Sequence, residues 1–112
     1  MTDCLFCRIV AGEVPADVVA ETDRTLAFRD VAPQAPTHVL VVPREHHDDV
    51  AACAEADPAL VGELLVAAAE VARAEGLTGG YRLLTNTGPD AGQTVHHLHV
   101  HVLGGRPLGS LG

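Results

Sequence analysis

The 112-residue chain contains no lysine and no tryptophan, and its only serine is Ser110, close to the C-terminus. Without lysine, the chain can neither form a Schiff base with a carbonyl substrate nor build a P-loop. A single serine near the end of the chain argues against a serine hydrolase. For covalent chemistry, the remaining nucleophiles are histidine, cysteine and the carboxylates.

Positive charge and long apolar runs are also scarce. The net charge is −8, and all seven basic residues are arginine. Binding to the phosphate backbone of nucleic acid without sequence preference requires a basic surface. We therefore expect neither nucleic acid nor a charged membrane as partner. No apolar run approaches the ~20 residues of a membrane span. The N-terminus lacks the features of a signal peptide, so we expect a cytoplasmic protein with one domain over residues 1–112.

Apolar periodicity and turn-forming residues predict two helices and five strands. Helices are expected over residues 3–11, capped by Asp3, and from Pro58 to Gly76, capped by Asp57; strands are expected over 17–21, 25–30, 37–43, 81–86 and 94–103. Asp48 or Asp49 is expected to cap a further short helical piece. Short connections favour antiparallel pairing. The pattern predicts an α+β fold with a five-stranded, mainly antiparallel sheet, one long and one short helix, and a C-terminal tail over residues 103–112.

Four of the seven histidines lie within residues 96–101. His97, His99 and His101 alternate with apolar residues, which is the period of a β-strand, so the three imidazoles are expected on one face. Successive positions on that face are about 6.5–7 Å apart, close enough for two imidazoles to act on one small group. Three interpretations are open: a solvent-facing strand, a metal site completed from another strand, and nucleophilic attack on phosphorus by neutral imidazole.

Cys4 and Cys7 have C-x-x-C spacing. Three cysteines in an expected cytoplasmic chain argue against a disulfide framework. A redox pair would follow a strand and precede a helix, whereas this pair stands at the start of the chain. Half of a zinc site, completed by ligands elsewhere, is therefore preferred over a redox pair or two incidental thiols. Cys53, among alanines, is expected to be a packed residue.

The stretch from His97 to Leu103 resembles the histidine triad, and the surrounding chain resembles the Hint branch of the histidine triad (HIT) superfamily. Further matching segments are 4–10, 28–30, 33–38, Asn86 and 92–94, so the resemblance covers about residues 3–106. It implies a HIT-like fold and a nucleotide hydrolase or transferase. Such an enzyme would cleave purine nucleoside 5′-phosphoramidates or acyl-adenylates at the α-phosphate, through a nucleotidyl-histidine. The alternatives are a purine-nucleotide-binding regulatory protein with little turnover and a metal-dependent hydrolase.

The resemblance also implies roles for individual residues. His99 would be the nucleophile, held by the carbonyl of His97; His101 would contact the phosphate and help protonate the leaving group, and His38 would support the nucleophile's protonation state. Asp30 matches the acceptor of the ribose hydroxyls. The polar phosphate and leaving-group contacts would be Asn86, Gly92, Gln93, Thr94 and Val95. The apolar purine slot would be Leu5, Phe6, Ile9, Phe28, Val31 and Leu40.

A structural zinc ion and a homodimer are further implications of the resemblance. The zinc ligands would be Cys4, Cys7, His46 and His97, with His47 as the alternative to His46, and no cofactor would be required for catalysis. The dimer would pair the long helices and extend the sheet. The chain departs from the family at His96, which stands where an aromatic residue is common, and at Thr94, which replaces a serine. Arg29 is expected beside the purine slot, where it could alter the base preference.

Overall fold

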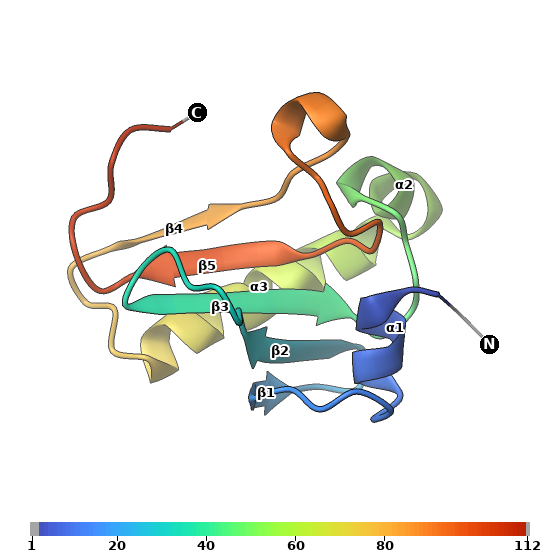
Figure 1. The fold of residues 1–112 in the computed structure, drawn as a ribbon, viewed down its shortest axis with the longest axis horizontal. Helices are drawn as coiled ribbons and strands as arrows, with labels where there is room; N and C mark the ends of the chain where they lie inside the picture. The colour runs from blue at the N-terminus through green and yellow to red at the C-terminus, as the bar shows by residue number, and fades with distance from the viewer. Residues whose placement is uncertain (1–2, 112) are drawn as a thin grey trace.

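The computed structural model describes residues 3–111, so both ends of the predicted domain 1–112, Met1–Thr2 and Gly112, lie outside the described residues. Its five strands form one antiparallel sheet in the order β1-β2-β3-β5-β4 (Figure 1). The strands are β1 (Val18–Glu21), β2 (Thr25–Arg29), β3 (Thr37–Pro43), β4 (Tyr81–Leu84) and β5 (Val100–Gly104). The predicted α+β fold with a five-stranded antiparallel sheet is confirmed.

Helices cover both faces of this sheet. They are α1 (Leu5–Val10), α2 (Val50–Ala56) and α3 (Pro58–Ala74), with a 3-10 turn, η1, at Pro89–Ala91. In Figure 1, α3 crosses behind the sheet and α1 lies in front of the β2–β3 end. α2 is the further short helical piece expected after Asp48 or Asp49, in addition to the one long and one short helix of the predicted fold; Asp49 caps it by accepting a hydrogen bond from the Ala52 N–H at 2.9 Å. Within residues 3–111, no helix is long and apolar enough to cross a membrane.

The helix ends follow local rules, with one exception. Asp57 caps α3 by accepting from the Leu60 N–H at 3.3 Å, and Pro58 occupies the first turn, as predicted. The prediction of Asp3 as cap of α1 is wrong. Cys4 takes that place, and its Sγ accepts from the Cys7 N–H at 3.3 Å. The first turn of α1 therefore already holds both cysteine sulfurs near each other.

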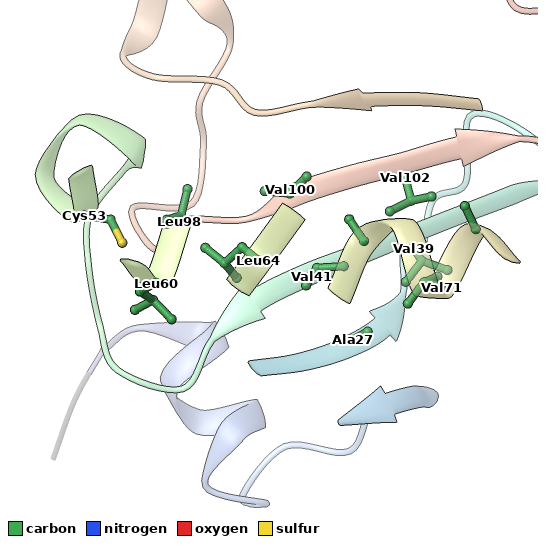
Figure 2. Close-up of a cluster of buried hydrophobic side chains, with 12 residues drawn as sticks. Ala27, Val39, Val41, Cys53, Leu60, Leu64, Val71, Leu98, Val100 and Val102 are labelled. Carbon is green, nitrogen blue, oxygen red and sulfur yellow. The ribbon is translucent and has the colours of Figure 1, made fainter. Parts of the chain in front are cut away.

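The central strand β3 is buried at every position. Val39 and Val41 point into the core between the sheet and α3, shown in Figure 2. That core consists of Ala27, Val39, Val41, Cys53, Leu60, Leu64, Ala68, Val71, Ala72, Leu98, Val100 and Val102. Leu40 and Val42 point to the opposite face, where they pack with Phe6 of α1. The two clusters fix β3 from both sides and make it a rigid platform.

The histidine segment is less regular than predicted. Strand β5 begins at Val100 rather than at residue 94, and β4 ends at Leu84 rather than at 86. Leu98 still reaches the α3 core, and its N–H donates to the carbonyl of His47 at 2.7 Å. The carbonyl of His97 accepts from a side chain instead of a neighbouring strand. Alternation of side chains therefore persists without a strand ladder.

Candidate active site and metal centre

His38 and the triad histidines gather on the sheet face that is turned away from α3. Leu40 lies opposite His101 in the β3–β5 register, and Phe28 lies opposite Leu40 in the β2–β3 register, so these side chains share one face. Phe6 of α1 packs edge-on against Phe28 and against the ring of His99, with ring centroids 5.4 and 5.1 Å away. Two residues of the predicted purine slot, Phe6 and Leu40, thus border an imidazole of the triad, and a third, Phe28, packs on Phe6.

The ring of His99 is held in one tautomer. Its Nδ1 lies 2.7 Å from the backbone carbonyl oxygen of His97. Because a carbonyl can only accept, Nδ1 carries the hydrogen, and Nε2 of the neutral ring keeps its lone pair. The side chain is buried, with 9% of its surface exposed. A buried imidazole with a free Nε2 lone pair is suited to nucleophilic attack.

A chain of hydrogen bonds assigns the tautomer of His101. The backbone N–H of Gln34 donates to Nδ1 of His38 at 3.0 Å, so the hydrogen of neutral His38 sits on Nε2. That Nε2–H donates to Nδ1 of His101 at 2.8 Å. His101 therefore presents Nε2–H, and this buried atom has no hydrogen-bond partner among the described residues. A buried donor without a partner costs about 1–3 kcal/mol, so this atom marks a place where an acceptor of a ligand fits.

Burial keeps this pair of imidazoles uncharged. It lowers the pKa of His101 to about 4, helped by the neighbouring His99 and His38 and opposed by the carboxylate of Asp30. Burial also lowers the pKa of His38, again against Asp30, whose Oδ2 lies 3.5 Å from the His38 Nε2. The other oxygen of Asp30 accepts from the Ala32 N–H at 2.8 Å. Both histidines are neutral near pH 7 in the free protein.

A second cluster joins α1 to the histidine segment. Its donor atoms come from Cys4, Cys7, His46 and His97 and lie within 4.8 Å of one another. Nδ1 of His97 is 3.3 Å from Sγ of Cys4 and 3.4 Å from Sγ of Cys7. Nδ1 of His46 is 3.2 Å from Sγ of Cys7 and 3.1 Å from Nδ1 of His97. Tetrahedral zinc bonded to nitrogen and sulfur separates its ligand atoms by about 3.3–3.8 Å, so the donor set fits a metal ion.

Outer hydrogen bonds turn both imidazoles of this cluster toward a common centre. His97 Nε2 lies 2.9 Å from the carbonyl oxygen of Pro43, and His46 Nε2 lies 2.9 Å from Oδ1 of Asp48. Each Nε2 therefore carries hydrogen, and each Nδ1 offers its lone pair. Burial lowers the pKa of His97 to about 4, which favours the neutral form that binds metal. His47 lies outside the cluster, its Nε2 being 3.0 Å from Oε1 of Glu45.

Gln93 does not have a free amide. Its Oε1 accepts from the Gly88 N–H at 2.9 Å, and its Nε2 donates to the carbonyls of Asp48 at 2.8 Å and Val95 at 3.1 Å. The side chain is buried. Gln93, which was expected at the phosphate, is thus hydrogen-bonded to the backbone of its own loop and to that of Asp48, close to His46. Sequence spacing gives no sign of this contact because Asp48 is far away in the chain.

The remaining predicted site residues differ in burial. Ile9 and Val95 pack against the Phe6 cluster, whereas Leu5 and Val31 are exposed. Asn86 is half-buried, and Gly92, Thr94 and His96 are exposed.

The placement of Arg29 beside the purine slot is wrong. Its guanidinium donates to both carboxylate oxygens of Glu75 at the end of α3, at 2.6 and 3.1 Å. Strand alternation explains the difference, because Phe28 faces the slot and its neighbour on β2 must face α3.

Comparison with known proteins identifies the family of the chain. The family model described as HIT domain matches residues 11–108. A HIT-like protein of Synechococcus elongatus is 52% identical over 106 residues, which cover 95% of this chain and 93% of that protein. A crystal structure of a HIT family hydrolase from Legionella pneumophila has a TM-score of 0.90 and 47% identity, with 94% of this chain and 95% of that chain covered.

A more distant structure has the same fold. A histidine triad nucleotide-binding protein from Candida albicans has a TM-score of 0.82 and 28% identity, with 98% of this chain and 87% of that chain covered. Since the family model spans most of the chain, and the relative from Synechococcus matches nearly all of it at 52% identity, this protein belongs to the HIT domain family.

Proposed function

We propose that this protein hydrolyses or transfers purine nucleotides by cleaving nucleoside 5′-phosphoramidates or acyl-adenylates at the α-phosphate. The observation that carries the proposal is the pair of defined ring atoms: the lone pair on Nε2 of His99 beside the unpartnered Nε2–H of His101. The two rings lie with centroids 5.0 Å apart, so both can reach one phosphate. A hydrolase and a nucleotide-binding protein among the structural neighbours support this reaction class.

In the first step, Nε2 of His99 attacks the α-phosphorus. A bond from nitrogen to phosphorus forms, the bond to the leaving amine breaks, and its electron pair stays on the amine, which takes a proton. The anionic phosphate opposes the burial that lowers the pKa of His101 to about 4, so the bound complex favours a protonated His101 that supplies this proton. His99 is left as a nucleotidyl-imidazolium, and the amine departs.

In the second step, water attacks the phosphorus and passes a proton to the now neutral His101. The bond between His99 and phosphorus breaks, which restores the neutral ring and releases the nucleoside monophosphate. In the free protein, the Nε2–H of His38 donates to Nδ1 of neutral His101 at 2.8 Å. Two displacements thus let one imidazole act first as nucleophile and then as leaving group.

The nucleoside would lie over β2 and β3. Its purine would pack on the apolar cluster that contains Phe6, Phe28 and Leu40, on the sheet face turned away from α3. Asp30, at the end of β2, would accept the ribose hydroxyls through the oxygen not bonded to Ala32. Asn86, Gly92, Thr94 and Val95 are proposed to contact the phosphate and the leaving group, with Gln93 holding their loop in place.

We further propose that Cys4, Cys7, His46 and His97 hold a structural zinc ion. When bound, zinc would supply a closed tetrahedral cross-link that stabilises the fold and would perform no chemistry on the nucleotide. The cluster ties α1, which contributes Phe6 to the slot, to the loop that precedes His99. Cys4→Ser should lower the zinc content of the purified protein, and unchanged zinc by metal analysis would reject this ligand set.

The reaction is tested with adenosine 5′-phosphoramidate as substrate. Wild type should release AMP, and quenching with alkaline denaturant, which preserves the acid-labile bond between histidine nitrogen and phosphorus, should trap a protein heavier by one AMP; His99→Ala should lose at least about a thousandfold in kcat. His96→Ala, an exposed histidine of the same segment, is the control and should keep turnover. Retained activity in His99→Ala rejects the covalent mechanism. AMP binding without turnover by wild type would favour the regulatory protein.

Treatment with a chelator tests the alternative of a metal-dependent hydrolase. Turnover should persist in protein that remains folded after zinc has been stripped, because no metal is needed at the phosphate. Loss of turnover in folded, metal-free protein would favour a metal-dependent hydrolase. Far-UV and near-UV circular dichroism establish whether the stripped protein is folded.

A further inference from the structure

The face that carries the catalytic histidines continues beyond His101 onto the edge strand. In the β4–β5 register, Leu84 lies opposite His101 and Arg82 lies opposite Leu103, so all four side chains share that face. A cleft of about 350 Å³ opens there. Its lining includes His38, His101, Leu84, Leu103, Arg82 and Arg106. The cleft is therefore bordered by the two imidazoles proposed to handle the leaving-group proton.

Both arginines of this cleft lack a carboxylate partner in the described part of the chain. Arg8, Arg24, Arg29 and Arg44, by contrast, each form an ion pair with Asp or Glu. Arg73 also has no ion pair within the described residues, but it lies exposed on α3, outside the cleft. In a protein with a net charge of −8, two arginines without an ion pair on one cleft concentrate positive potential there. That potential favours an anion between them.

The backbone contacts of these arginines leave donors available. Arg82 donates one N–H to the carbonyl of Gly109 at 2.9 Å. Arg106 donates to the carbonyls of Pro107 at 2.9 Å and Gln34 at 3.0 Å. A guanidinium has five N–H donors in a planar fork that matches carboxylate and phosphate oxygens. The contacts to Gly109 and Gln34 also fix both side chains, which lowers the entropic cost of binding an anion.

The cleft lies on the opposite side of His101 from the purine slot. The slot residues Phe28 and Leu40 stand on β2 and β3, and the cleft residues Leu84 and Arg82 stand on β4. A nucleotide seated in the slot with its phosphorus at His99 would therefore direct its leaving group over β5 toward β4. This orientation rests on the proposed function.

We propose that Arg82 and Arg106 form a subsite that selects leaving groups with a terminal negative charge, a carboxylate or a phosphate. Leu84 and Leu103, with Leu108 of the tail, give the cleft an apolar floor suited to the carbon chain between the reacting nitrogen and the anion. The arginines act on substrate choice, not on bond cleavage.

Three adenosine 5′-phosphoramidates test this subsite: those of glycine, of glycinamide and of O-phosphoethanolamine. Glycine and glycinamide differ only in the charge at the far end, and the third compound presents a phosphate. The wild-type kcat/KM for the preferred anionic substrate should exceed that for glycinamide by about five- to tenfold, as expected for partly exposed charge-assisted contacts. This ratio should fall with added salt. The ranking of the two anions identifies which one the subsite takes.

Arg82→Gln and Arg106→Gln should each reduce the ratio, and the double variant should bring it close to one. Both substrates are measured on the same protein preparation, so a purely structural effect on the tail would lower both rates and leave the ratio unchanged. Arg73→Gln removes one exposed charge from α3 and should leave the ratio intact. A wild-type ratio near one, or a ratio unchanged in the double variant, overturns the subsite. Absence of turnover for all three substrates removes the proposed function and the subsite with it.

Discussion

His97 and His99 are joined by a hydrogen bond from the imidazole Nδ1–H of His99 to the backbone carbonyl oxygen of His97, 2.7 Å long. The ring of His97 belongs to the cysteine–histidine cluster, with its Nδ1 3.3 Å from Sγ of Cys4. One residue therefore contributes its side chain to the proposed metal centre and its carbonyl to the proposed nucleophile. The position of His99 depends on the cluster through a single peptide unit.

The first prediction concerns the outer contact of the metal centre. Asp48→Ala removes the acceptor that lies 2.9 Å from Nε2 of His46, so the ring loses its fixed orientation. Loss of such a partner lowers metal affinity about tenfold or more. Competition with a chromophoric zinc chelator measures the change.

The neighbouring variant Asp49→Ala is the matched control. Asp49 accepts from the Ala52 N–H and caps α2, so its loss should cost about 1 kcal/mol of stability in urea unfolding. Zinc affinity should stay unchanged. An equal loss of affinity in both variants would show that the contact of Asp48 with His46 has no special part in metal binding.

Much of the fold could be predicted because local and tertiary preferences agree. Strand β3 is β-branched and apolar throughout, and both of its faces are in fact buried. Asp57 followed by Pro58 marks the start of α3 because both residues favour the first turn of a helix. Asp3 failed as the cap of α1, although aspartate is a better cap than cysteine, because the sulfur of Cys4 lies both at the helix start and in the cluster.

The histidine segment shows where sequence patterns lose information. Alternation of His97, His99 and His101 predicted a strand, and the imidazoles do share a side, yet only His101 stands in β5. Alternation with period 2 predicts which side chains point to the same face. It does not predict whether the backbone of the segment forms hydrogen bonds with a neighbouring strand. The contact of Gln93 with Asp48 and that of Gln34 with His38 use backbone atoms, which carry no sequence signal.

The second prediction is a pH dependence of stability that comes from His101. Its pKa lies near 6.5 in the unfolded chain and at about 4 in the folded protein. Between these pH values the unfolded chain binds more protons than the folded protein. The free energy of unfolding is therefore highest above pH 6.5 and falls as the pH drops toward 4. Urea unfolding at several pH values measures this loss.

His101→Gln isolates that contribution from the other histidines. The variant should show a shallower fall in stability between pH 6.5 and 4 than wild type, because it lacks one group that takes up a proton on unfolding. Below pH 4 the two slopes should converge. Parallel curves across the whole range would mean that His101 is not held neutral by burial.

The third prediction uses Gly105, where the tail leaves β5. Its φ is +100°, and an added Cβ would lie 2.9 Å from Cβ of Pro36, in the loop before His38. Gly105→Ala should therefore destabilise the protein by about 1–3 kcal/mol and slow turnover by shifting that loop. Gly109→Ala meets no atom within 4 Å and should leave both unfolding and turnover unchanged. Thermal unfolding and phosphoramidate turnover are measured for both variants. Equal stability and turnover of Gly105→Ala and Gly109→Ala would contradict the predicted steric clash with Pro36.

The last prediction separates two roles for Gln93. If its amide chiefly holds the loop, Gln93→Ala leaves the Gly88 N–H and the carbonyls of Asp48 and Val95 without their partner. Water replaces part of these bonds at the surface, so the expected loss is about 2 kcal/mol in urea unfolding of the protein without nucleotide. Zinc affinity should also fall, because Asp48 belongs to the loop of His46.

Asn86→Ala is the matched control for that experiment. Asn86 is also an amide near the proposed phosphate position, but its side chain makes no hydrogen bond within the described residues. Its loss should leave unfolding within about 0.5 kcal/mol of wild type and weaken only the turnover of nucleotide substrates. If Gln93→Ala behaves in the same way, with intact stability and impaired turnover alone, Gln93 is a direct phosphate contact. The hydrogen bonds to Gly88, Asp48 and Val95 would then have to break when substrate binds.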